Sequence, residues 1–131
     1  MEDVKEIKKD KIAIVACSGA SNTGQITNEV AKNLCKDAEN FTMVCLAALP
    51  LGARSAMDKI ENAKKIIVVD GCPIKCASQL IGKYTDKKPD IAFQVMEDYG
   101  VKKVSDPNDV DLEEVDKITK DVLAKIKNLS N

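Results

Sequence analysis

The stretch "KIIVVDGCPIKCASQL" (residues 65–80) predicts a buried strand over 65–71 that turns directly into a helix. Its four consecutive branched residues are typical of a strand that is covered on both faces. Pro73 suits the first residue of a helix, where the missing N–H costs nothing. We therefore expect Cys72 to be the N-cap residue of this helix and Cys76 to lie at the end of its first turn.

The same alternation of apolar strand and amphipathic helix continues along the chain in both directions. Strands alternating with helices indicate a parallel sheet that is covered on both faces. We expect one α/β domain over residues 1–131, a three-layer αβα fold with a mostly parallel, four-stranded, Rossmann-like sheet. Further strands are predicted over 11–17, 41–49 and 90–96, and helices around Ile26, Val30 and Leu34, over 54–63 and over 111–129, with a site-bearing core at 12–96.

Composition excludes several classes of partner. The formal net charge of −1 provides no bulk field toward nucleic acid, and an aromatic content of 3% provides no platform for stacking bases. The charged N-terminal residues lack the apolar stretch of a signal peptide. No window approaches the roughly 18 apolar residues of a membrane span. We expect a cytoplasmic protein with neither a nucleic-acid nor a membrane partner.

Five cysteines and no histidine restrict the chemistry that this chain can perform. In a reducing cytosol, clustered thiols more often bind metal or react than form disulfides. The absence of histidine removes the usual general base and the commonest zinc ligand other than a thiolate. Thiolates, carboxylates, lysines and backbone amides remain as the groups that could bind a ligand or react.

Three cysteines fall at the ends of predicted strands. Cys17 ends the first strand, Cys45 lies toward the end of the second, and Cys72 follows the third. The carboxyl ends of parallel strands share one edge of the sheet, where open α/β folds bind ligands. Cys76 is expected to return to the same edge. Four thiolates there predict a tetrahedral zinc site, and the same set is compatible with an iron–sulfur cluster.

Two further residues are candidates for supporting these thiols. Lys75 offers a positive charge beside Cys76, and the amides of the predicted helix start are expected to lower thiol pKa values. Asp70 either accepts hydrogen bonds from amides around the site or only caps the turn after the strand. Cys35, on the apolar face of the first helix, is expected to be a core thiol.

The glycine-rich loop "SGASNTG" (18–24) has two interpretations. A nucleotide-hydrolysing P-loop is excluded, because Gln25 and Ile26 occupy the positions of its lysine and its serine or threonine. A plainer anion site at the helix start remains open, and so does a purely structural cap formed by Asn22 with Gln25. The residues that would present groups to an anion are Gly19, Ser21, Asn22 and Gly24.

The blocks "CSGASNTGQITNEVAKNL" (17–34), "CLAAL" (45–49) and "DGCPIKCA" (70–77) together resemble the DGC-domain family of zinc-binding proteins. The resemblance runs over about residues 12–85. It implies zinc binding by the family's four motif cysteines, and it implies no particular reaction. Those cysteines fall on Cys17, Cys45, Cys72 and Cys76.

Two classes of function stay open at this point. The first is a metal-binding module: a structural site, or a carrier or sensor of zinc or of a softer metal. The second is an enzyme, with redox chemistry at Cys72 and Cys76 or with an open three-thiolate metal site. Four thiolates close the coordination sphere and disfavour hydrolysis, whereas an outward-facing Cys45 would leave one position open. No catalytic residue can be assigned.

Overall fold

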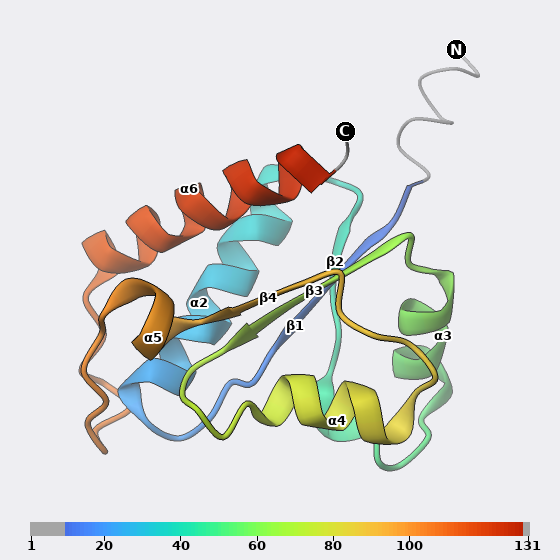
Figure 1. The fold of residues 1–131 in the computed structure, drawn as a ribbon, viewed down its shortest axis with the longest axis horizontal. Helices are drawn as coiled ribbons and strands as arrows, with labels where there is room; N and C mark the ends of the chain where they lie inside the picture. The colour runs from blue at the N-terminus through green and yellow to red at the C-terminus, as the bar shows by residue number, and fades with distance from the viewer. Residues whose placement is uncertain (1–9, 130–131) are drawn as a thin grey trace.

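A four-stranded, entirely parallel sheet forms the centre of the protein (Figure 1). The structure, a computed structural model, describes residues 10–129. The strand order is β2-β1-β3-β4, with Ile12 of β1 opposite both Phe41 and Lys65. The predicted α/β three-layer fold is confirmed. The strands are β1 (Ile12–Ala16), β2 (Phe41–Met43), β3 (Lys65–Asp70) and β4 (Ile91–Gln94).

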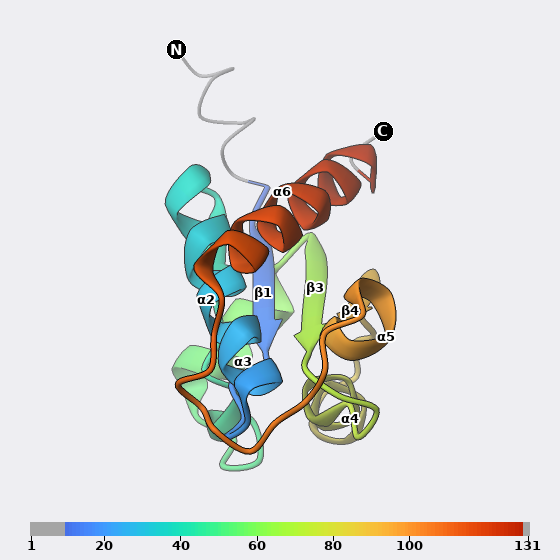
Figure 2. The same ribbon diagram turned by 90° about the vertical axis from the view of Figure 1, so that its left-hand side faces the viewer.

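Helices cover both faces of this sheet. The helices α2 and α6 lie on one face, and α3 and α4 lie on the other (Figures 1 and 2). None of the helices within residues 10–129 has the length and apolar character needed to cross a bilayer. The helices are α2 (Asn22–Asp37), α3 (Arg54–Asn62), α4 (Cys76–Tyr84), α5 (Val95–Tyr99) and α6 (Leu112–Leu129), with a 3-10 turn, η1, at Leu46–Ala48.

The two central strands are buried on both sides, which explains their continuous apolar sequences. Alternate residues of β1 enter different cores: Ile12 and Ile14 pack with α2 and α6, whereas Ala13 and Val15 pack with α3 and α4. The predicted apolar face of α2 is confirmed, because its buried residues include Ile26, Val30, Ala31 and Leu34.

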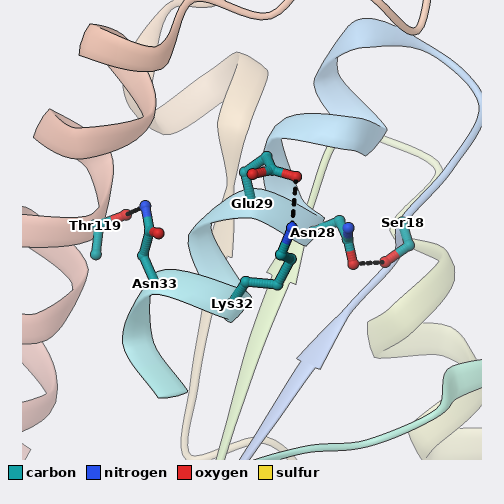
Figure 3. A network of polar contacts seen from close by, with 6 residues as sticks. All are labelled: Ser18, Asn28, Glu29, Lys32, Asn33 and Thr119. Atoms are coloured by element: carbon teal, nitrogen blue, oxygen red, sulfur yellow. Dashed lines mark hydrogen bonds and ion pairs between the residues drawn. The ribbon is translucent and has the colours of Figure 1, made fainter. Parts of the chain in front are cut away.

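Polar side chains of α2 connect it to its neighbours (Figure 3). Asn33 Nδ2 donates to Thr119 Oγ1 of α6 over 3.5 Å. At the other side of α2, Asn28 Oδ1 accepts from the Ser18 hydroxyl at the end of β1, over 3.2 Å. The ion pair Lys32–Glu29 lies on the exposed surface of α2, where such a pair contributes little stability. The helix is therefore tied both to the α6 layer and to the loop that follows β1.

Both edge strands are shorter than predicted. The segment after Met43 forms η1 instead of more strand, in keeping with the helical propensity of its leucines and alanines. After Gln94 the chain turns into α5, a helix that the sequence pattern did not indicate, and the Gln94 side chain caps it by accepting from Glu97 N. Leu112, the first residue of α6, is exposed.

The predicted start of α4 was also wrong. This helix begins at Cys76, and Cys72 is not its N-cap. Residues 72–75 form a turn in which Lys75 N donates to Cys72 O over 3.0 Å. Lys75 takes the N-cap position with a left-handed φ of 55°. Cys76 is therefore the first residue of the helix and not the end of its first turn.

Candidate functional site

Three of the cysteines line one hollow at the carboxyl edge of the sheet. Cys17 directly follows β1, Cys72 follows β3 after Gly71, and Cys76 opens α4. The hollow has a volume of about 380 Å³, and residues of the 19–24 loop form its opposite wall. We call it the thiol hollow. None of its three cysteines forms a disulfide bond.

The other two cysteines lie elsewhere. Cys45 follows β2 at the same edge of the sheet, but it is exposed at the N-cap of η1 and does not line the thiol hollow. Cys35 packs against the core between the sheet and α6, as expected. Burial raises the pKa of the Cys35 thiol, and Lys59 opposes this with a smaller effect. Cys35 is thus a core thiol that is held in its neutral form.

The thiol hollow has suitable donors for a metal ion, although they have not converged. Within residues 10–129, no group of three cysteine, aspartate or glutamate side chains is already arranged to hold a metal ion. Zinc would need each sulfur about 2.3 Å away. The donor chemistry fits, because thiolates are the ligands that zinc and other soft metals prefer. Cys17, Cys72 and Cys76 are the residues that would hold such an ion.

Close glycine contacts bring the walls of the thiol hollow together. A Cβ atom added at Gly24 would lie 2.6 Å from backbone atoms of Gly19. One added at Gly71 would lie 2.9 Å from Gly24 N and from the carbonyl group of Thr23. The first turn of α2 therefore rests directly on the turn that leads into Cys72. Both glycines serve packing between backbones.

The start of α2 is capped by Ser21, and the predicted cap at Asn22 was wrong. Ser21 Oγ accepts from Gly24 N over 3.3 Å, which occupies one of the N–H groups expected for an anion. The Gln25 side chain donates to Gly19 O over 2.8 Å. Gly19, Ser21 and Gly24 line the thiol hollow, and Asn22 does not.

Asn22 instead holds a distant segment, residues 101–105, which we call the strap. Its side chain donates to Lys102 O over 2.9 Å and accepts from Val104 N over 2.6 Å. Between these two residues, Lys103 places its Nζ 3.7 Å from Cys72 Sγ. Figure 2 shows the chain between α5 and α6 passing the ends of β1 and β3. No local pattern indicates this contact, because the strap lies about 80 residues from Asn22.

Lys75 does not accompany the cysteines. Its side chain lines a different hollow, together with Asp70 and Glu97, so the lysine in contact with a thiol is Lys103. Lys75 has a left-handed backbone next to Cys76, and Ser18 has one, with a φ of 49°, next to Cys17. Among residues 10–129 these are the two residues other than glycine with a positive φ.

Ser18 is held in this conformation by α2. Its N–H donates to Thr27 Oγ1 over 3.0 Å, and its hydroxyl donates to Asn28, as Figure 3 shows. Thr27 Oγ1 also lies 3.6 Å from Cys17 Sγ. Because the Thr27 hydroxyl donates its one proton to Gly24 O, it can only accept in its contact with Cys17 Sγ. The Thr27 hydroxyl thus contacts both the turn after β1 and the Cys17 side chain.

Asp70 caps α4. Its buried carboxylate accepts from Ala77 N over 2.8 Å, from Ser78 N over 3.2 Å and from the Ser78 hydroxyl over 2.8 Å. These bonds go to the two residues that follow Cys76, so the Asp70 carboxylate accepts from amides beside the thiol hollow and also caps the start of α4. The hydrogen bonds explain why α4 begins at Cys76, because they fix the amides of the next two residues.

The pKa of Cys76 is raised, although a helix start was expected to lower it. Loss of solvent contributes most, followed by repulsion from Cys17, Asp70 and Cys72, and only the thiol's own backbone N–H opposes these effects. Cys17 and Cys72 are therefore close enough for a negative charge on either of them to act on Cys76. A cation bound between them would relieve this repulsion.

The family model of the DGC domain matches residues 13–122. A Pseudomonas aeruginosa protein, "Anaerobic and virulence modulator AnvM", is 28% identical over 71 residues. This match covers 54% of the chain and 53% of the relative, so the chain spans about half the length of the relative that it matches. No solved structure matches the chain.

Proposed function

Because this chain belongs to the DGC-domain family, we propose that it binds a thiolate-preferring metal ion, zinc, in the thiol hollow. The ligands in this proposal are Cys17, Cys72 and Cys76, with Cys45 as the fourth. The observation that carries it is the meeting of thiols from three separate junctions in one hollow. The role that follows is that of a metal-binding carrier or sensor.

Backbone conformation supports this choice of ligands. Ser18 and Lys75, the residues with left-handed backbones, each adjoin a proposed ligand, Cys17 or Cys76. Such conformations cost on the order of 1–3 kcal/mol, and they cluster at functional sites where the surrounding structure enforces them. Here the hydrogen bonds of Ser18 to α2 and the cap of Asp70 on α4 supply that enforcement.

Cys45 decides between a closed and an open site. It is exposed just after β2, so it joins the other thiols only if the segment around η1 turns inward. With Cys45 bound, four thiolates fill the coordination sphere, as in a carrier or sensor. Its exposed position also favours a second candidate function, an enzyme whose metal ion keeps an open position. A metal ion of that kind supplies Lewis-acid activation of water.

The first experiment measures metal content and affinity in protein purified without chelators. We expect about one zinc per wild-type chain by elemental analysis. Serine substitutions of Cys17, Cys72 or Cys76 should abolish binding. Cys45→Ser should still bind zinc, but with a lower affinity than the wild type. A weaker chelator should therefore suffice to remove its zinc. Cys35→Ser, which removes a thiol outside the thiol hollow, is the matched control and should bind like wild type.

Other outcomes identify the alternatives. Wild-type affinity in Cys45→Ser would indicate a three-thiolate site and favour the enzyme. Bound iron and sulfide with a brown absorption would indicate an iron–sulfur cluster in place of zinc. A wild-type chain that takes up no metal at saturating zinc would refute the metal-binding proposal and favour redox chemistry at Cys72 and Cys76.

A further inference from the structure

The strap, residues 101–105, crosses from α5 to α6 beside the thiol hollow and contributes Lys103 and Ser105 to its lining. We propose that Lys103 is a positioning residue of the metal site: it holds the Cys72 sulfur and offsets its negative charge, and Asn22 fixes the strap for this purpose. This inference rests on the proposed function.

Three hydrogen bonds fix the strap on either side of Lys103. The Asn22 side chain donates to Lys102 O and accepts from Val104 N, and the backbone N–H of Asn22 donates to Val104 O over 3.1 Å. Asn22 is only 4% exposed, so water does not compete for these bonds. Val101 is buried in the core with α2 and α6 and anchors the beginning of the strap. The backbone of Lys103 is thus held at both of its neighbours.

The hydrogen bonds from Asn22, which we call the clamp, place the ammonium group of Lys103 next to the Cys72 thiol. The Nζ of Lys103 lies 3.7 Å from Cys72 Sγ, and Lys103 is the one basic residue, among those the structure describes, that lines the thiol hollow. The neighbouring Lys102 is exposed and does not line it. Both lysines are exposed, but of the two side chains it is that of Lys103 which contacts the proposed ligand.

The contact between Lys103 and Cys72 matters because a zinc ion bound by thiolates forms a negatively charged site. A zinc ion with three thiolates carries a formal charge of about −1, and with four it carries about −2. The chain itself has a net charge of −1, so no bulk positive field offsets that excess. Groups that contact metal ligands typically change metal affinity by about 10- to 100-fold when they are removed. Lys103 is placed to have such an effect through Cys72.

The test compares zinc affinity in the full chain by competition with a chromophoric chelator. Lys103→Met should bind zinc about tenfold or more weakly, because it retains a similar length without the charge. Lys103→Arg should recover most of the loss, since a cation is restored. Lys102→Met is the matched control and should bind like wild type. The Lys103 side chain is exposed at the mouth of the hollow, so all three variants are expected to fold.

A double-mutant cycle tests the clamp. Asn22→Ala should weaken zinc binding in the wild-type background but add little once Lys103→Met is present, because both changes remove the same contact. Additive losses would overturn the role of Asn22. Wild-type affinity in Lys103→Met, an equal loss in Lys102→Met, or no recovery in Lys103→Arg would overturn the role of Lys103. Failure of the wild-type chain to bind zinc would refute the proposed function instead.

Discussion

At the scale of single residues, Gly71, in the triplet Asp70-Gly71-Cys72, allows two backbone segments to pack closely. Gly71 lies under the first turn of α2, and Gly24 on that turn lies against Gly19. No side chain separates these three backbone segments. The distance between the Cys17 and Cys72 walls of the thiol hollow therefore depends on two missing Cβ atoms.

Gly24→Ala and Gly71→Ala should each lower the free energy of unfolding by about 1–3 kcal/mol. Their Cβ atoms would meet backbone atoms at 2.6 and 2.9 Å, and backbone cannot rotate away as a side chain does. Urea denaturation measures the effect as a lower midpoint with an unchanged slope.

The control for this pair is Gly82→Ala in α4. No atom lies within 4 Å of its added Cβ, and alanine favours helix over glycine by up to about 1 kcal/mol, so Gly82→Ala should be neutral or stabilising. If all three alanine variants had the same stability, the packing role of Gly24 and Gly71 would be wrong.

At the scale of elements, the start of α4 shows how a stronger cap overrides a sequence preference. Pro73 and Cys72 suggested a helix start, but a thiol is a weak hydrogen-bond acceptor. The Asp70 carboxylate accepts from two amides of α4 and from one hydroxyl. Charge-assisted bonds of this kind are stronger than neutral ones, so the helix begins where Asp70 can reach it.

Asp70→Ala should lower the free energy of unfolding by about 1–3 kcal/mol, because it leaves the buried Ala77 N–H without its acceptor. Ser78→Ala removes a single hydroxyl contact to the same carboxylate and should cost about 1 kcal/mol. Thermal and urea unfolding of both variants measure the difference. A smaller loss in Asp70→Ala than in Ser78→Ala would contradict the capping role.

The accuracy of the predicted elements follows their position in the sheet. The central strands β1 and β3 match the predicted 11–17 and 65–71 to within a residue at each end, because only buried strands require long branched runs. The edge strands end earlier. The leucine and alanine residues after Met43 suit a helical turn as well as a strand, and α5 is too short to show a period of its own.

At the scale of the whole molecule, two apolar cores hold the sheet and its helices together. One lies between the sheet and α2 with α6, and the other lies between the sheet and α3 with α4. The thiol hollow is at the edge of both and contributes little apolar burial. We therefore expect the fold to persist when no metal is bound.

Removal of zinc by a chelator should leave the far-UV circular dichroism spectrum unchanged. The midpoint of thermal unfolding should fall, because a ligand that binds only the folded state stabilises it in proportion to the logarithm of its free concentration relative to its Kd. Untreated protein in the same buffer is the control. A random-coil spectrum after chelation would show that the metal is architectural.

The meeting of three thiols could be predicted from the sequence, whereas the position of Cys45 outside the hollow and the surroundings of the thiols could not. Cys17, Cys72 and Cys76 come together because parallel strands place their carboxyl ends at one edge, a rule that needs only the order of elements. Lys103 reaches Cys72 through a loop of irregular structure, and Asn22 resembled an ordinary cap. Contacts between segments 80 residues apart leave no local pattern to recognise.

The position of the strap also sets an order of assembly during synthesis. All proposed ligands have left the ribosome once Cys76 has emerged, yet Lys103 is made 27 residues later, after β4 and α5. A growing chain therefore exposes its thiols before the lysine that contacts one of them exists. During that interval the nascent protein carries these thiols without their cationic neighbour, and only the nearly finished chain can assemble the complete hollow.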